Sequence, residues 1–151
     1  MKINIVSVGN LKEEYLILAQ KEYVKRLQRF CDLTIIEIKQ CSIDEPSVSK
    51  QQELVSILPY LNGFIIVLDI KGKEISSEEF SRKINAWGCD GISTITLVIG
   101  GSHGLHDEII KKANFKLSFS PMTFPHQLIR INLLEQIYRA YTIINNIPYH
   151  K

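Results

Sequence analysis

The sequence predicts an α/β protein in which a mainly parallel sheet lies between helices. Short apolar runs rich in β-branched residues alternate five times with segments of helical periodicity. The third run is apolar almost throughout, which is typical of a strand buried on both faces of a parallel sheet. No repeat, linker or low-complexity tract interrupts the alternation, and domains usually have about 100–200 residues. We therefore expect one domain over residues 1–151.

The expected strands cover residues 3–8, 33–38, 64–70, 95–99 and 116–120. After the third of them, Lys71-Gly72-Lys73 is expected to turn the chain out of the sheet. Asn10 is expected to cap the first helix, and Ser76 with Glu79 forms a capping-box pattern before a helix that ends at Gly88. The other helices are expected near 50–61, 107–113 and 126–145, with a loop over 39–49.

Composition narrows the class of protein without fixing its function. A hydrophobic content of 45%, a charged content of 23% and a net charge of +2 are ordinary for a globular protein and only permit nucleic-acid binding. The three cysteines are scattered, which fits a reducing compartment. The start of the chain does not resemble a signal peptide, and no apolar run approaches the ~20 residues that span a bilayer. We expect a cytoplasmic protein that does not enter membranes.

The motifs exclude several chemistries. Residues 100–104 read GGSHG, which lacks the GxGxxG spacing of dinucleotide sites, and no P-loop or GxSxG motif occurs. The four histidines and three cysteines show no metal-ligand spacing, so no metal is expected. What remains is a glycine turn that lets the main chain approach a ligand closely, although a tight turn alone explains the same residues.

Two loops follow strands four and five, and both can lie at the carboxyl edge of the sheet, where open α/β folds bind ligands. We interpret them as parts of one cofactor site. Ser118, Ser120 and Thr123 are interpreted as loop and capping hydroxyls rather than nucleophiles. His126 opens the last helix, where its ring is expected to cap the helix or orient a loop rather than to catalyse.

The last helix is apolar on two sides. One side carries Ile129, Leu133, Ile137, Ala140 and Ile144, and the second carries Leu134, Tyr138 and Tyr141. Such a helix needs more than one cover, which favours a partner subunit, with one large core as the alternative. Glu135 and Arg139 are expected to form an i,i+4 pair. The basic residues Lys21, Lys25, Arg26 and Arg29 of the first helix form either a solvated face or an RNA-facing patch.

Four blocks, taken together, resemble one known family. They are VLDIKGK (67–73), VIGGSHGL (98–105), LSFSPMTFPHQLIRINLLEQIYRAY (117–141) and the terminal PYHK (148–151). They resemble the small SPOUT-class RNA methyltransferases, which methylate N3 of a pseudouridine in bacterial 23S ribosomal RNA. The resemblance covers the whole chain. It implies an α/β knot with a C-terminal trefoil, a homodimer, and a substrate in the inter-subunit hairpin of the large subunit of assembled ribosomes.

The resemblance also implies S-adenosylmethionine, bound in a bent form, as methyl donor. Matching the family's motif residue by residue puts this cofactor against Leu68, Gly100 and the loop Phe119, Ser120, Pro121, Met122, Thr123 and Phe124. The tail Tyr149-His150 followed by Lys151 matches the family's terminal Tyr-His and basic residue. Our hypothesis is that His150 accepts the N3 proton and Tyr149 stacks on or hydrogen-bonds the base, with an ordinary frayed terminus as the alternative. Arg130 is a weaker candidate for contact with RNA phosphate or for support of the loop.

Two other functions remain open at the level of residues. One is a SPOUT methyltransferase that acts on tRNA or on another ribosomal RNA position. The other is a non-catalytic module that binds ribosomes, against which the family-like loop SFSPMTFPH and the PYHK tail argue. A test of cofactor binding distinguishes the non-catalytic module from either methyltransferase. The identity of the modified nucleotide then distinguishes the pseudouridine methyltransferase from one that acts on another RNA position.

Overall fold

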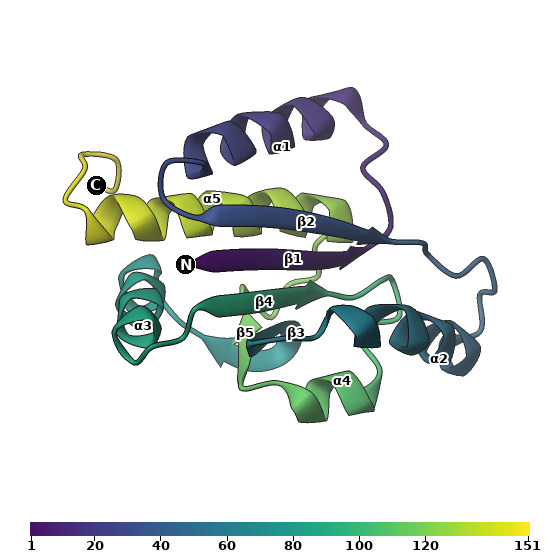
Figure 1. The fold of residues 1–151 in the computed structure, drawn as a ribbon. Helices are drawn as coiled ribbons and strands as arrows, with labels where there is room; N and C mark the ends of the chain where they lie inside the picture. The colour runs from purple at the N-terminus through teal and green to yellow at the C-terminus, as the bar shows by residue number, and fades with distance from the viewer.

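A computed structural model describes all residues 1–151 and contains one five-stranded sheet with helices on both faces (Figure 1). The strands are β1 (Lys2–Val8), β2 (Asp32–Ile38), β3 (Phe64–Glu74), β4 (Thr94–Ile99) and β5 (Phe115–Ser118). Their order is β2-β1-β4-β3-β5, and every neighbouring pair is parallel. The expectation of a parallel sheet between helices is therefore confirmed, and all five strands occur where the apolar runs predicted them.

The helices are α1 (Glu14–Leu27), α2 (Pro46–Ile57), α3 (Ser77–Cys89), α4 (Asp107–Lys112) and α5 (His126–Ile144), with a short 3-10 turn, η1 (Leu58–Tyr60). Helices α1, α3 and α5 cover one face of the sheet, and α2 with α4 covers the other. Successive side chains of each strand point to opposite faces of the sheet. In β1, Ile3 and Ile5 join the first core, whereas Val6 and Val8 join the second. None of these helices is both long and apolar enough to cross a membrane.

Two expected helix starts are wrong. Asn10 does not cap α1, because the helix begins at Glu14 after a non-helical Glu13 that makes no side-chain cap. Helix α2 begins at Pro46, inside the segment expected to be a loop, because the Glu45 carboxylate accepts hydrogen bonds from the amides of Ser47 and Val48. This cap satisfies two of the free amides at the helix start, and proline fits the first helical position.

The third strand also continues beyond its expected end. Lys71-Gly72-Lys73 does not leave the sheet, because β3 runs to Glu74 after an outward bulge. Both Leu68 and Lys73 pair with Leu117 of β5, so residues 69–72 are excluded from the ladder. Gly72 lies against β5 so closely that a Cβ there would stand 2.7 Å from the carbonyl carbon of Leu117. The bulge thus needs a glycine at its return point.

The end of α3 and the cover of α5 differ from expectation as well. Helix α3 ends at Cys89, and the glycine in the left-handed conformation that follows it is Gly91, not Gly88. Helix α5 lies against both α1 and α3 (Figure 1). Tyr138 and Tyr141, on its second apolar side, are buried within the single chain. The apolar circumference of α5 therefore does not by itself require a partner subunit.

Candidate functional site

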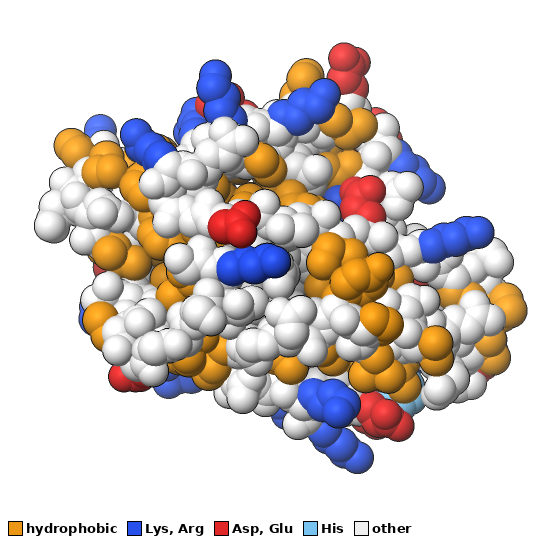
Figure 2. Space-filling model, in the orientation of Figure 1, with side chains coloured by type: hydrophobic (Ala, Val, Ile, Leu, Met, Phe, Trp, Pro, Cys, Tyr) orange, Lys and Arg blue, Asp and Glu red, His pale blue; other side chains and the backbone are white.

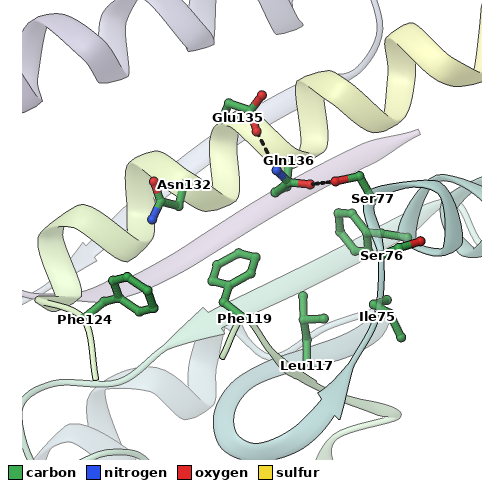
Figure 3. A pocket seen from close by; sticks show the side chains of 10 residues that line it. Ile75, Ser76, Ser77, Leu117, Phe119, Phe124, Asn132, Glu135 and Gln136 are labelled. Atoms are coloured by element: carbon green, nitrogen blue, oxygen red, sulfur yellow. Dashed lines mark hydrogen bonds between the residues drawn. The ribbon is translucent and has the colours of Figure 1, made fainter. Parts of the chain in front are cut away.

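A pocket of about 390 Å³ opens between the end of β3, strand β5 with its following loop, and α5 (Figure 3). Its ten lining residues come from these segments and from the first turns of α3: Ile75, Ser76, Ser77, Phe80, Leu117, Phe119, Phe124, Asn132, Glu135 and Gln136. In Figure 3 the ring of Phe119 points toward α5, whose Asn132, Glu135 and Gln136 form the opposite wall. One wall is thus apolar and aromatic, and the other carries amides and a carboxylate, a mixture typical of small-molecule sites.

The polar wall is held by hydrogen bonds within the chain. Ser77 donates from Oγ to Oε1 of Gln136 at 2.6 Å, and Nε2 of Gln136 donates to Oε2 of Glu135 at 2.6 Å (Figure 3). The start of α3 is fixed by a capping box in which Ser76 and Glu79 satisfy each other's backbone amides, as the sequence predicted. The pocket is therefore largely pre-formed.

The predicted cofactor residues lie on β3 and on the segments that follow β4 and β5, and only some of them line this pocket. Phe119 and Phe124 line it. Ser120, Pro121, Met122 and Thr123 belong to the same loop, in which the Ser120 hydroxyl accepts from the Met122 amide at 3.0 Å. Leu68 pairs with Leu117 beside the pocket, and Gly100 follows the end of β4.

Gly100 lies in a crowded turn. A Cβ there would be 2.9 Å from the carbonyl carbon of Gly104 and 3.0 Å from Cγ of Leu105. No larger side chain fits without movement of the main chain, so this glycine has a steric reason to be present.

A buried carboxylate supports this turn from α2. Glu53 is only 5% exposed and accepts a hydrogen bond from Ser49 Oγ at 3.3 Å. Burial raises the pKa of Glu53, whereas the backbone amides of Cys41 and Gly101 act in the opposite direction by hydrogen-bonding its charged form. Nε2 of His103, in the same turn, lies 3.0 Å from Oδ1 of Asp44. Two carboxylates outside the sheet thus anchor the turn after β4.

The C-terminal tail is folded back onto α5 rather than extended. Tyr149 donates from its hydroxyl to Oε1 of Glu135 at 3.2 Å, and its ring packs edge-on against Tyr138 at 4.9 Å. The guanidinium of Arg139 lies 4.8 Å from the Tyr149 ring centre. Burial raises the pKa of Tyr149 to about 12, with smaller contributions from Tyr23 and Glu135. Tyr149 is therefore a neutral, ordered hydroxyl at the side of the pocket.

Both nitrogens of the His150 ring have partners. Arg139 donates from Nη1 to Nδ1 at 3.0 Å, and because arginine can only donate, the ring proton is on Nε2, which lies 2.7 Å from Oε1 of Glu78. This contact with His150 is the main reason that the pKa of Glu78 falls to about 2. The expected pair of Glu135 and Arg139 is confirmed, at 2.6 and 3.0 Å. The tail and the pocket therefore share one hydrogen-bonded network.

The structure excludes one of the two expected roles of each of Arg130 and His126, namely RNA contact for Arg130 and helix capping for His126. Arg130 is fully buried and cannot contact RNA, because its guanidinium donates to Ser7, to the Gly9 carbonyl, to Gln20 and to the carboxylate of Glu37. His126 does not cap α5, since the capping position is Pro125 and no side-chain cap is made. Burial lowers the pKa of His126, assisted by the nearby charges of Arg130 and Lys12. Both residues support the turn that follows β1.

Several residues of the site were not predicted. Glu78 reads in the sequence as a solvated charge near a helix start, and Glu135 only as half of an i,i+4 pair. Asn132 and Gln136 carry no motif, and only the packing of α5 over β5 brings them into the pocket. No group of three or more His, Cys, Asp or Glu side chains is placed to hold a metal ion.

Comparison with known proteins agrees with this geometry. A family model described as "Predicted SPOUT methyltransferase" matches residues 1–150. The ribosomal RNA large subunit methyltransferase H of Clostridium botulinum (strain Kyoto / Type A2) is 50% identical over 159 residues, which cover all of both chains. The protein of the same name from Clostridium kluyveri (strain NBRC 12016) is 48% identical, again over the full length of both.

A solved structure supports the fold. A probable methylase family protein from Haemophilus influenzae Rd KW20 aligns with a TM-score of 0.57 over 99% of this chain and 70% of its own, at 17% identity. At that identity the likeness concerns the arrangement of strands and helices only. The family model and the full-length relatives together decide the assignment, and the resemblance seen in the four sequence blocks is confirmed. The chain belongs to the SPOUT methyltransferase family.

Proposed function

We propose that this protein transfers a methyl group from S-adenosylmethionine to N3 of a pseudouridine in 23S ribosomal RNA, in the inter-subunit hairpin of assembled ribosomes in the cytoplasm. The full-length relatives named as ribosomal RNA large subunit methyltransferases support the substrate class. The observation that carries the proposal is the shared network in which Glu135 both lines the pocket and accepts from Tyr149 of the tail. A docking module would not need such a connection.

S-adenosylmethionine is proposed to bind against Leu68, Gly100 and the loop Phe119, Ser120, Pro121, Met122, Thr123 and Phe124. The residues present suit it, because the aromatic rings of Phe119 and Phe124 offer apolar contact to adenine. The turn at Gly100 lets main-chain groups approach the ligand without a side chain between them. When bound, the cofactor supplies an electrophilic methyl group on a sulfonium centre.

The chain's own residues then have two tasks, which are to align the base and to take its proton. Methyl transfer to N3 would require an in-line approach of the base to the donor's methyl group, and the pocket walls and the tail would hold the base in that alignment. His150 is proposed to accept the N3 proton through Nδ1. In the structure this nitrogen accepts from Arg139, so the Arg139 contact must shift when the base arrives. Tyr149 is proposed to stack on or hydrogen-bond the base.

We further propose a knotted chain and a homodimer. Strand β5 lies at one edge of the sheet beside β3, whereas the α5 helix that follows it packs between α1 and α3, so the chain crosses the carboxyl edge between them. This crossing is compatible with the trefoil that the family implies. For the dimer, Tyr15, Leu18 and Leu128 are 67%, 55% and 37% exposed at the starts of α1 and α5. A second copy is the commonest cover for such a surface.

The test uses purified protein, labelled S-adenosylmethionine and ribosomes from cells that lack this gene, with the product nucleotide mapped by mass spectrometry. Label on N3 of a large-subunit pseudouridine is the expected result. Cofactor binding without label on these ribosomes would move the substrate to another RNA, and no cofactor binding at all would refute methyl transfer. Sedimentation of Leu18→Glu tests the dimer separately, since a variant that remains dimeric would exclude this surface.

A further inference from the structure

The exposed face of α1 carries a row of cations in its second half. Lys21, Lys25 and Arg29 are each exposed and are spaced four residues apart, the last of them just beyond the end of the helix. At about 1.5 Å of rise per residue, the row is about 12 Å long. Figure 2 shows Lys and Arg side chains along the edge of the molecule that α1 forms in Figure 1.

These three cations have no ionic partner within the chain. Their neighbour Arg26 is paired with Glu22 at 2.7 Å, but no carboxylate lies within 4.0 Å of the charged groups of Lys21, Lys25 or Arg29. Arg29 instead lies over the ring of Phe30, at 4.6 Å from its centre. The row is therefore free to bind an anionic ligand without breaking an internal ion pair.

The row is also connected to the tail. The guanidinium of Arg26, the residue after Lys25, is 5.6 Å from the ring centres of both Tyr23 and Tyr138. Tyr138 in turn packs against Tyr149. One aromatic cluster thus holds the C-terminal half of α1 and the tail together, with the exposed Lys151 adding a further cation at the end of the chain.

We propose that Lys21, Lys25 and Arg29 form a docking surface for RNA phosphates, which seats the substrate so that its target base reaches Tyr149 and His150 of the same subunit. The proposal rests on the proposed function. Unpaired, flexible cations on an exposed helix suit the repeated charge of a phosphate backbone, and they offer nothing that would read base edges. The surface therefore supplies affinity, and selection of the nucleotide falls to the pocket and the tail.

The test compares Lys21→Gln/Lys25→Gln/Arg29→Gln with the control Lys111→Gln/Lys112→Gln, which removes two exposed lysines from α4 on the opposite face. Binding to unmodified ribosomes is measured by co-sedimentation over a series of salt concentrations, with and without isolated 23S ribosomal RNA as competitor. For the triple variant we expect about tenfold weaker binding and a salt dependence whose log–log slope is smaller by about 2, since each single-strand phosphate contact contributes roughly 0.7. Cofactor affinity and Tm should stay at wild-type values in both variants.

The outcomes separate this surface from the proposed function. The docking surface would be refuted if the triple variant bound ribosomes with wild-type affinity and a wild-type salt dependence. It would also be refuted if weaker binding were accompanied by lower cofactor affinity or a lower Tm. Binding that 23S ribosomal RNA fails to compete would overturn it in favour of a ribosomal protein partner. If only the triple variant loses salt-dependent binding, the docking surface is supported, whether or not the wild type transfers a methyl group. Absence of methyl transfer by the wild type would refute the proposed function and not the docking surface.

Discussion

Tyr149 donates a 3.2 Å hydrogen bond to Glu135, a residue fourteen positions earlier whose carboxylate also lines the pocket. The same carboxylate oxygen accepts two bonds from Arg139, which in turn donates to His150. Glu135 is thus the point where the tail is joined to the pocket. A change in the charge of Glu135 should therefore affect both the docking of the tail and the pocket.

Glu135→Gln should release the tail. Hydrogen bonds to a charged group contribute about 1.5–3 kcal/mol, so their weakening should shift tail docking by roughly tenfold to a hundredfold. We expect carboxypeptidase to remove the last residues at least about tenfold faster, and turnover on ribosomes to fall by a similar factor. The control is Glu108→Gln, an exposed carboxylate on α4. Digestion at the wild-type rate would show that Glu135 does not hold the tail.

The tail should also respond to alkaline pH through Tyr149. Its pKa is raised from 10.0 to about 12, chiefly by burial, so the docked state favours the neutral hydroxyl. The contribution of this group to docking is therefore complete below about pH 10 and is lost as the pH rises through about 12. Tyrosinate absorbance, taken as the difference between wild type and Tyr149→Phe, should show a step near pH 12. A step at the ordinary tyrosine pKa would mean that the ring is solvated.

Glu53→Ala should weaken cofactor binding from a distance. The substitution removes the buried acceptor beside Gly101 and frees the turn that contains Gly100. We expect the Kd for S-adenosylmethionine to rise about tenfold, the effect of about 1.4 kcal/mol, when it is measured well below the Tm of the variant. Ribosome affinity should change less than about twofold. Gln51→Ala, an exposed neighbour on α2, is the control, and an unchanged Kd in Glu53→Ala would exclude this supporting role.

Arg130→Met should destabilise the fold without touching RNA binding. Removing one partner of a buried, multiply bonded ion pair typically costs about 3–5 kcal/mol in the free energy of unfolding, because other polar groups lose their partner. Glu37→Gln should cost less, since that carboxylate is 38% exposed. Denaturant unfolding measures both, with exposed Arg82→Met as control. Reduced ribosome affinity with unchanged stability would instead return Arg130 to the RNA interface.

Local patterns in the sequence predicted the sheet well. Each strand carries its own alternation of side chains between two cores, so a short window is enough to recognise it. Helix α2 shows the limit of this approach, since Glu45 and Pro46 form a helix start inside the segment 39–49, which the sequence predicts to be a loop. The extension of β3 through residues 71–74 could not be recognised, because its sequence KGKE is polar and only Lys73 and Glu74 pair with β5, through the backbone.

The site was predictable only in part, for a different reason. Loops that follow parallel strands lie at one edge of the sheet, so the strand pattern alone placed the loops after β4 and β5 at that edge, and Phe119 and Phe124 of the second loop do line the pocket. No comparable rule predicts contacts between side chains that are distant in the sequence. The contact of His150 with Glu78 spans 72 positions, and the choice of Glu135 over other polar residues of α5 depends on how that helix is rotated over β5. Helical periodicity gives the buried side of a helix but not which polar residue faces a cavity.

The bulge in β3 makes the pairing of β3 with β5 independent of the number of residues in the bulge. Because Leu68 and Lys73 both pair with Leu117, the residues between them project from the ladder and do not set the position of β5. An extra residue among 69–71 can be absorbed in this projection, and Leu117 at the floor of the pocket keeps its place. Gly72 is the exception, since a side chain there would push directly on the backbone of β5. The number of residues in this projection can therefore change while the pocket beside it keeps its dimensions.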